Sequence, residues 1–443
     1  MKASRRLTRG FFIGQKETIQ KTLLINTKFL YLTINQHSSL KPMNFLCICT
    51  YFKGVEFLKS CKAEGNAVYL LTNQKLQDKA WPHESLDEIF YLDNVENTFD
   101  TYQKILVGLA NIMKSKKIDR VVALDDFDVE KAALVREHFR IPGMGQTTAR
   151  YFRDKLAMRV QAQDSGIAVP PFSPLFHDID ITEYLHSTSP PWVIKPRSEA
   201  SAAGIRKVYS FQEAWDTLHT LGDERHNFLI EQFKPGNVYH VDSLTLNGQV
   251  IFTRCSQYLN TPFEVAHGGG IFRSVTVEHN SEDNLALQKM NEDVMRAFGM
   301  KSSASHTEMI KCYEDGQFYF LETASRVGGA NLAEMVDYSS GINLWREWAK
   351  IETAVATGGT YELPKIEDFY SGIVISLSSH ERPDYSPFND PEIVWKMDEE
   401  YHIGLIVRSK SREKVMELMD KYASMIRDLG YHASAPSPDK PVH

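Results

Sequence analysis

Residues 306–329 read HTEMIKCYEDGQFYFLETASRVGG, with the turn signal Glu-Asp-Gly between two apolar-rich runs. In an antiparallel hairpin, side chains share a face only at matching parity. A three-residue loop ending in Gly316 sets Glu308 directly opposite Glu322, because the glycine supplies the left-handed position that such a loop requires. A two-residue Asp-Gly turn instead places the two carboxylates on opposite faces. The stretch therefore predicts a carboxylate pair, provided that the longer loop forms.

The chain also carries the groups that a nucleoside triphosphate with Mg²⁺ requires. Lys195 ends the strand WVIKP, and the small-residue loop Arg197–Gly204 follows it. The backbone N–H groups of such a loop can close over phosphates without side-chain obstruction. Glu231, in LIEQF, stands where a carboxylate can meet adenine and ribose, and Lys155 precedes both. A lone lysine at a strand end is usually just an exposed charge. The order of these residues predicts an Mg-ATP site.

Composition excludes several classes of protein. The chain has 443 residues, 42% hydrophobic and 24% charged, enough for two or more globular domains. A net charge of −7 gives no basic field for nucleic acid, and no apolar run reaches the roughly 20 residues that span a bilayer. Five scattered cysteines favour a reduced, cytoplasmic interior. Cys47 and Cys49 are expected to be buried strand residues rather than metal ligands.

The first 42 residues differ from the rest of the chain. They hold eight basic residues against the single acid Glu17. They lack the amphipathic repeat and the cleavage signal of a transit peptide. Met43 stands directly before the buried-type strand NFLCIC. Our hypothesis is that Met43 is the true initiator and that residues 1–42 are a basic extension outside the fold. Native peptides from upstream of Met43 would contradict it.

After Met43, apolar strands alternate with amphipathic helices, which predicts a parallel sheet with helices on its faces. No Gly-x-Gly-x-x-Gly motif follows the first strand, so a dinucleotide role is not expected. Strand RVVALD ends in Asp125 and Asp126, at the edge where such sheets bind ligands. Both acids can instead be caps at a solvated helix start. Residues 146–165 are expected to form one helix that ends at Gly166.

From Asn227 onward the strands lengthen into a mostly antiparallel sheet. On one of them His240 and Asp242 share a face by period-2 spacing, so they either line the cavity or form a structural hydrogen-bonded pair. Residues 261–273, TPFEVAHGGGIFR, are the expected substrate loop, since three consecutive glycines favour a mobile or closely approaching backbone. Arg273 suits a substrate carboxylate. The alternative is a flexible hairpin tip with solvated charges.

The motifs RDKLAM (153–158), WVIKPRSEASAAGI (192–205), FLIEQF (228–233), HTEMI (306–310) and FLETASRVGGA (320–330) resemble the ATP-grasp superfamily. Their order and spacing are similar to its branch of carboxylate–amine ligases, which includes the bacterial L-amino acid ligases. The resemblance covers about residues 43–430 and is strongest over 142–345.

The resemblance implies an ATP-grasp fold of α/β and α+β type. It has a Rossmann-like N-terminal domain, a small lid subdomain and a larger, mostly antiparallel C-terminal lobe, with ATP between the lobes. The expected division is 1–42 basic extension, 43–147 Rossmann-like domain, 148–226 lid subdomain with its linker helix, 227–360 large subdomain with the metal site, 361–432 closing αβ subdomain and 433–443 flexible tail.

The resemblance also implies roles for single residues. The nucleotide is expected to contact Lys155, Lys195, Ser201, Gly204, Glu231 and Phe233. Glu308 and Glu322 match the carboxylates that hold Mg²⁺, with Mn²⁺ as the alternative ion. Arg326 and Lys195 match catalytic cations, and substrate contacts fall on His267, Gly269, Arg273, Arg326, Gly328 and Gly329. One departure is Ala324, where many members have an asparagine as a further metal ligand, which leaves the number of Mg²⁺ ions open.

The implied reaction is ADP-forming. A carboxylate is activated as an acyl phosphate, and an amine, expected to be an amino acid, displaces the phosphate to give an amide. The expected partners are small-molecule acid and amine substrates, and a homodimer is left open. One alternative is a degenerate ATP-binding sensor or scaffold, which Ala324 favours. The other is a carboxylase acting with a biotin or purine partner.

Overall fold

The computed structural model describes residues 42–199, 204–260 and 269–434. Ser201, His267, the basic extension through residue 41 and the tail from residue 435 lie outside the described ranges. Residues Met43–His443 form one compact unit. Among the helices of the described residues, none combines the length and the apolar character needed to cross a membrane.

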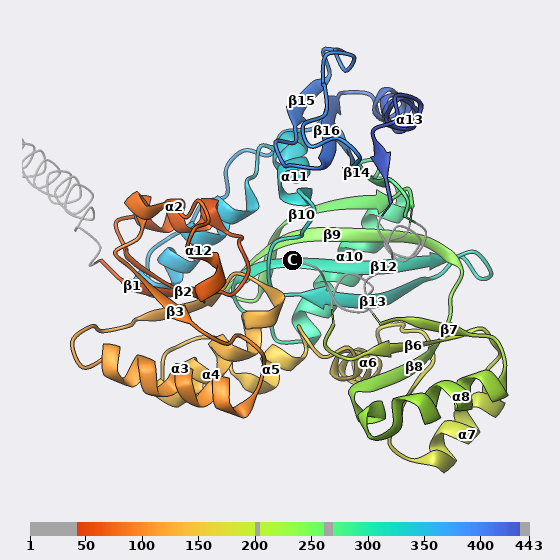
Figure 1. The fold of residues 1–443 in the computed structure, drawn as a ribbon, viewed down its shortest axis with the longest axis horizontal. Helices are drawn as coiled ribbons and strands as arrows, with labels where there is room; N and C mark the ends of the chain where they lie inside the picture. Colours follow the sequence, from red (N-terminus) through yellow and green to blue (C-terminus); the bar gives the residue numbers. More distant parts are fainter. Residues whose placement is uncertain (1–41, 200–203, 261–268, 435–443) are drawn as a thin grey trace, which may run out of the picture. The chain divides into compact units, whose positions relative to one another are not determined.

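The N-terminal layer is a parallel sheet in the order β3-β2-β1-β4 (Figure 1). Alternate residues of β1 point to opposite faces, as the period of a strand requires. Phe45, Cys47 and Cys49 pack toward α2 and α12, whereas Leu46 and Ile48 pack toward α3 and α4. The expected burial of the two cysteines is confirmed. The elements of this layer are β1 (Asn44–Cys49), α2 (Val55–Ala63), β2 (Ala67–Asn73), β3 (Glu88–Leu92), α3 (Phe99–Ile112), β4 (Arg120–Ala123) and α4 (Val129–Phe139).

A small antiparallel sheet follows, in the order β5-β8-β6-β7. Its strands are β5 (Phe172–Pro174), β6 (Trp192–Pro196), β7 (Arg206–Val208) and β8 (Phe228–Gln232). Helices α7 (Asp178–Ser187) and α8 (Phe211–Leu221) bury apolar side chains, Ile181 and Leu218 among them, against Trp192 and Ile194. The strand with Glu231, placed by sequence with the large sheet, is thus hydrogen-bonded into the small one.

The large sheet has nine strands among the described residues, in the order β13-β12-β9-β10-β11-β14-β16-β15 with β17 beside β14. Because β11 pairs with β14, the large sheet continues without a break into residues 361–432, the expected closing αβ subdomain. Its strands are β9 (Gly236–Leu246), β10 (Gln249–Tyr258), β11 (Phe272–Thr276), β12 (Ser303–Cys312), β13 (Phe318–Ala324), β14 (Tyr370–Ser378), β15 (Ile393–Lys396), β16 (His402–Ser409) and β17 (His432–Ala433). Its helices are α10 (Glu282–Ala297), α11 (Leu332–Ser340), α12 (Leu344–Thr357) and α13 (Arg412–Asp428).

The single helix predicted over 146–165 is two helices, α5 (Gln146–Arg150) and α6 (Lys155–Asp164). The break occurs because the Asp154 side chain accepts a hydrogen bond from the Leu156 N–H at 3.0 Å and so caps α6. Gly166, at φ +75°, follows the helix end as expected. The break puts Lys155 at the first position of a helix, beside the loop after β6.

The β12–β13 hairpin reaches the predicted pairing by a different route. Cys312 pairs with Gln317, so the loop has four residues instead of three, and Gly316 takes the left-handed position at φ +69°. Continued regularly, that register would set Glu308 opposite Leu321. A bulge at Leu321 shifts it by one residue, and Glu308 pairs with Glu322. The predicted loop length is wrong, whereas the predicted pairing is confirmed.

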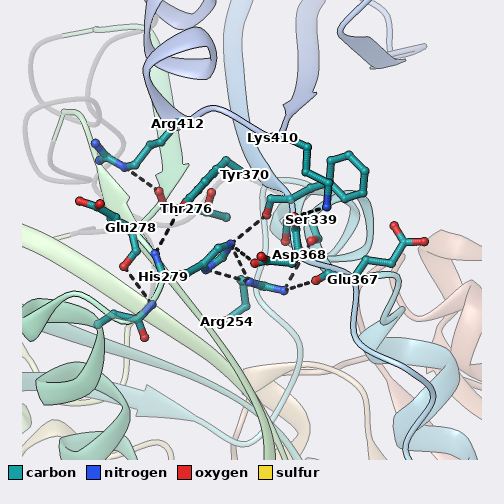
Figure 2. Close-up of polar contacts among 12 residues, drawn as sticks. Arg254, Thr276, Glu278, His279, Ser339, Glu367, Asp368, Tyr370, Lys410 and Arg412 are labelled. Carbon is teal, nitrogen blue, oxygen red and sulfur yellow. Dashed lines mark hydrogen bonds and ion pairs between the residues drawn. The ribbon is translucent and has the colours of Figure 1, made fainter.

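A polar cluster around the buried Arg254 fastens the segment before β14 to the middle of the large sheet (Figure 2). The guanidinium of Arg254 on β10 donates to the backbone oxygens of Ser339, at 3.4 Å, and Glu367, at 3.1 Å. His279 stacks on Tyr370 with ring centroids 4.4 Å apart. Burial and the neighbouring Arg254 lower the pKa of His279. Both effects favour the neutral form of the imidazole in the folded protein.

Candidate active site

A cavity of about 950 Å³ is lined by residues of the small sheet, the large sheet and the N-terminal layer. That volume lies within the range of small-molecule sites. Of the residues singled out from sequence, Asp126, Lys155, Lys195, Glu231, Phe233, Glu308, Glu322, Arg326 and Gly329 line it. Arg153, Tyr258 and His306 line it as well and carry no predicted role.

The two acids of the hairpin lie on one face of the large sheet. The hydroxyl of Tyr258 donates to Glu308 Oε1 at 2.9 Å, and the ammonium of Lys155 lies 2.7 Å from Glu322 Oε2. Burial acts to raise the pKa of Glu322, but Lys155 and then Lys195 outweigh it and the pKa is lowered. Carboxylate oxygens are the ligands that Mg²⁺ takes. The pair fits a divalent cation, with the Lys155 ammonium held at one of its oxygens.

Lys195 is buried and shares a counter-ion with Arg159. Glu231 accepts from Lys195 Nζ at 2.5 Å through one oxygen and from Arg159 Nη2 at 2.9 Å through the other. Burial lowers the pKa of Lys195 to about 8, although Glu231 acts to raise it. Sequence reasoning missed Arg159, although its i+4 spacing from Lys155 on α6 was a usable signal. Glu231 thus anchors two cations, and its neighbour Phe233 lines the cavity beneath the ammonium of Lys207.

The loop after β6 is tied to the start of α6. The Lys155 N–H donates to the Arg197 carbonyl at 2.8 Å, and its ammonium donates to the Glu199 carbonyl at 2.7 Å. Gly204, at φ +69°, ends the loop where a Cβ would come within 2.9 Å of the Pro196 ring. The described part of the predicted phosphate loop therefore lies beside both lysines, while Ser201 is outside the described residues.

Arg326 marks the end of the cavity next to the N-terminal layer. Its Nη2 is paired with Asp126 Oδ2, and its Nη1 donates to the Val327 carbonyl at 2.9 Å. Burial acts to raise the pKa of Asp126, but Arg326 outweighs it and the pKa is lowered. Asp125 caps the turn by accepting from the Phe127 N–H and pairs with Lys53 at 2.6 Å. Both acids are buried, so the solvated-cap reading is wrong for Asp126.

Three buried atoms at this end have no hydrogen-bond partner among the described residues: Asp126 Oδ1, Arg326 Nε and Arg153 Nε. Buried polar atoms are nearly always paired, so an unpaired group inside a cavity calls for an explanation. Two guanidinium groups and one carboxylate face a common space. This end of the cavity is therefore suited to a small polar ligand that carries charge.

His240 and Asp242 form the structural hydrogen-bonded pair, one of the two readings left open, and neither lines the cavity. Asp242 is shared: Oδ2 lies 2.7 Å from His240 Nδ1, and Oδ1 lies 2.8 Å from His306 Nδ1. Burial acts to lower the pKa of His306, but Asp242 outweighs it and raises the pKa to about 9. Sequence reasoning missed His306, which shares a strand face with Glu308 at i+2 spacing.

The predicted substrate contact of Arg273 is not supported. Its guanidinium is paired with Asp420 on α13 at 2.7 Å and holds Asn260 Oδ1, at 3.3 and 3.2 Å. Asn260 lines the cavity, whereas Arg273 does not, because alternate residues of β11 face opposite ways and Phe272 takes the inner side. Gly269, at φ +63°, lies against Ser434, and His267 is outside the described residues.

No family model matches this chain. The L-arginine-specific L-amino acid ligase of Bacillus subtilis is 24% identical over 265 residues, which make up 58% of this chain and 62% of that protein. This chain thus matches less than two thirds of that relative's length. The crystal structure of an L-amino acid ligase from Bacillus licheniformis superposes with a TM-score of 0.66 at 20% identity, over 88% of this chain and 98% of that one.

A third similar protein is the biotin carboxylase domain of 2-oxoglutarate carboxylase from Hydrogenobacter thermophilus, a dimer solved with MgADP, ADP and bicarbonate. It superposes with a TM-score of 0.64 at 15% identity, over 85% of this chain and 88% of that one. At these identities the similarity concerns the fold. The parallel N-terminal layer, the small antiparallel sheet and the large antiparallel sheet match these structures, and this chain therefore has the ATP-grasp fold.

Proposed function

We propose that the protein is a Mg-ATP-dependent, ADP-forming ligase that activates a carboxylate as an acyl phosphate and couples it to an amine, in particular an amino acid. The observation that carries the proposal is the pairing of Glu308 with Glu322 on one face of the large sheet, within reach of Lys155 and with Lys195 lining the same cavity. The named activities of the two L-amino acid ligases support it.

The β9–β12 register orders the parts of the cavity. Cys312 pairs with Gly236, close in sequence to the Glu231–Phe233 segment; Glu308 pairs with His240, and His306 with Asp242. Followed from its C-terminal end, β12 therefore passes from the junction with the small sheet, past the acid pair, to the end that holds Arg326. We assign the adenine to the junction, the phosphates to the middle and the carboxylate substrate to the Arg326 end.

Each residue has a definite task in this reaction. Mg²⁺, held by Glu308 and Glu322, would offset charge on the phosphate oxygens. Lys155 and Lys195 neutralise the phosphates, and Arg326 faces the charge that develops on the transferring group. The substrate carboxylate oxygen attacks the γ-phosphorus and ADP leaves. The neutral amine nitrogen then attacks the acyl carbon and loses a proton to solvent, and phosphate departs with the oxygen that it gained.

Two alternatives remain distinguishable. A sensor or scaffold without turnover is disfavoured by the presence of Glu308, Glu322, Lys195 and Arg326 in one cavity, because each matches a chemical step. A carboxylase is the second candidate, since the similar structure from Hydrogenobacter thermophilus is a biotin carboxylase domain that was solved with bicarbonate. In that case bicarbonate takes the place of the organic acid.

A coupled assay of ADP release over a panel of acids and amines, bicarbonate included, tests the proposal. Turnover that needs both an organic acid and an amine supports the ligase. Turnover that needs bicarbonate supports the carboxylase, and nucleotide binding without turnover supports the sensor. Glu322→Gln keeps the size of the side chain but removes its charge, so the rate is expected to fall about 10²–10³-fold, as for the loss of one preorganised charge contact.

A further inference from the structure

A third donor atom stands beside the acid pair. His306 lies two residues before Glu308 on β12, so the two side chains share a face. Its Nε2 is 3.6 Å from Glu308 Oε1. Two ligand atoms at right angles on one small divalent cation lie about 3 Å apart, given ligand distances of about 2.1 Å. A small shift thus brings both atoms onto one ion.

The contacts that the described residues make with the Nε2 atom of His306 are long. Its nearest contacts are the Tyr258 hydroxyl at 3.4 Å and the Glu308 carboxylate at 3.6 Å, both beyond good hydrogen-bond length. The Tyr258 hydroxyl is already directed at Glu308, at 2.9 Å. The imidazole is more than nine-tenths buried, yet it lines the cavity. A buried nitrogen that faces the cavity and is held only by these two long contacts is available to a ligand.

The other ring nitrogen is fixed from behind. His306 Nδ1 lies 2.8 Å from the fully buried carboxylate of Asp242, which His240 holds on its second oxygen at 2.7 Å. Gly328 closes the arrangement, because a Cβ there would come within 2.9 Å of Asp242 Oδ1 and 3.0 Å of His306 Nδ1. A carboxylate that orients a histidine by its far nitrogen is the usual support of a metal-binding imidazole.

His240, Asp242 and His306 do not form a cage by themselves, although their polar atoms lie within 4.8 Å of one another. Each oxygen of Asp242 already accepts from one imidazole, and His240 Nε2 lies 2.7 Å from the Ser274 hydroxyl. The facing polar atoms of these three side chains are therefore already hydrogen-bonded to one another. The open coordination direction is that of His306 Nε2, toward Glu308.

We propose that His306 is a nitrogen ligand of the same divalent cation as Glu308 and Glu322, with Asp242 as its positioning residue. This rests on the proposed function, which puts the ion at the two acids. Ala324, opposite His306 in the ladder, offers no donor atom there. A cation that binds Nε2 replaces its proton, while Nδ1–H stays on Asp242. An imidazole ligand shifts the preference of the site away from Mg²⁺, which takes oxygen ligands, and toward transition metals such as Mn²⁺.

The test is electron spin-echo envelope modulation on the full-length protein with Mn²⁺ and ADP. We expect a ¹⁴N coupling from one imidazole, converted to a ¹⁵N coupling when the protein carries ¹⁵N-histidine. His306→Gln is expected to remove that coupling and to weaken Mn²⁺ binding about 10–100-fold, and Asp242→Asn to weaken it to a similar degree. The exposed His138→Gln is the matched control and is expected to change nothing.

The outcomes separate the two claims. A Mn²⁺–ADP complex with ³¹P coupling but no ¹⁴N coupling overturns the histidine ligand and leaves the proposed function standing. A ¹⁴N coupling that survives His306→Gln and disappears in His267→Gln also overturns it. Failure of the protein to bind Mn²⁺ with ADP at all contradicts both. The isotope comparison on the wild-type protein remains decisive if a variant does not fold.

Discussion

Asp126 and Arg326, 200 residues apart in the chain, form an ion pair that joins the N-terminal layer to the end of the hairpin motif. In the proposed reaction Arg326 faces the transferring group. Its ion pair with Asp126 means that a residue of another layer sets its position. Arg326 lines the cavity, and its Nε has no hydrogen-bond partner among the described residues. The N-terminal layer in this way contributes a residue to the candidate active site.

Asp126→Asn is expected to lower kcat about 10²-fold, because the amide keeps the size but not the charge that holds Arg326 in place. Steady-state kinetics with saturating ATP measures the effect. Asp93→Asn is the control, since Asp93 is paired with Lys104 at the exposed surface of the same layer. Equal kinetics for Asp126→Asn and the wild type would refute the positioning role.

Nucleotide affinity is expected to fall as the pH rises above about 8, because the pKa of Lys195 in the free protein is lowered to about 8. Phosphate binding needs the ammonium form, so binding takes up a proton above that pH, and affinity falls by up to about tenfold per pH unit. Lys195→Arg stays charged and is expected to lose this slope. Calorimetry of ADP binding in two buffers with different ionisation enthalpies measures the proton uptake.

Glu231→Gln is expected to destabilise the protein by about 3–5 kcal/mol, because it leaves Lys195 and Arg159 buried against a neutral amide. Burial acts to raise the pKa of Glu231, but Arg159 and Lys195 lower it below its ordinary value. The unfolded chain then binds more protons, so this stability is full above about pH 4.3 and is lost as the pH falls through the folded pKa. Urea unfolding of the wild type and of Glu231→Gln between pH 3 and 7 measures the effect. Equal free energies of unfolding for the two proteins would mean that Glu231 does not interact with Lys195 and Arg159.

His279 gives a second pH dependence, in a different window. Burial and then Arg254 lower its pKa, so as the pH falls the unfolded chain binds a proton at a higher pH than the folded protein does. Stability is therefore full above about pH 6.5 and declines as the pH falls from there toward the folded pKa. His279→Gln is expected to flatten that part of the curve. An unaltered slope between pH 5 and 7 would mean that the imidazole titrates freely in the folded protein.

Sequence alone predicts the elements that local chemistry determines. The alternation of strands and helices after Met43 gives the parallel layer, and the pairing of Glu308 with Glu322 is predicted, although from the wrong loop length. The bulge that produces this pairing cannot be predicted from the local sequence. The carbonyl of the bulged Leu321 accepts a hydrogen bond from Arg159, 162 residues earlier, and a contact of that separation has no signature in either segment.

The same limit explains what sequence reasoning missed at the site. Arg273 and Phe272 are adjacent in sequence, and only the packing of β11 against α13 decides which of them faces the cavity. The ion pairs of Asp126 with Arg326 and of Glu231 with Arg159 likewise join separate layers. His306 is a mixed case. Its spacing from Glu308 was visible in the sequence, but its orientation depends on Asp242 from the neighbouring strand.

The central claim is that a carboxylate oxygen attacks the γ-phosphate, and isotope transfer tests it most directly. With an acid labelled by ¹⁸O in both carboxylate oxygens, an amine and ATP, we predict that each inorganic phosphate released carries one ¹⁸O, as measured by ³¹P NMR or mass spectrometry. Product formed with unlabelled phosphate, or with the ¹⁸O in AMP, would contradict the acyl-phosphate mechanism.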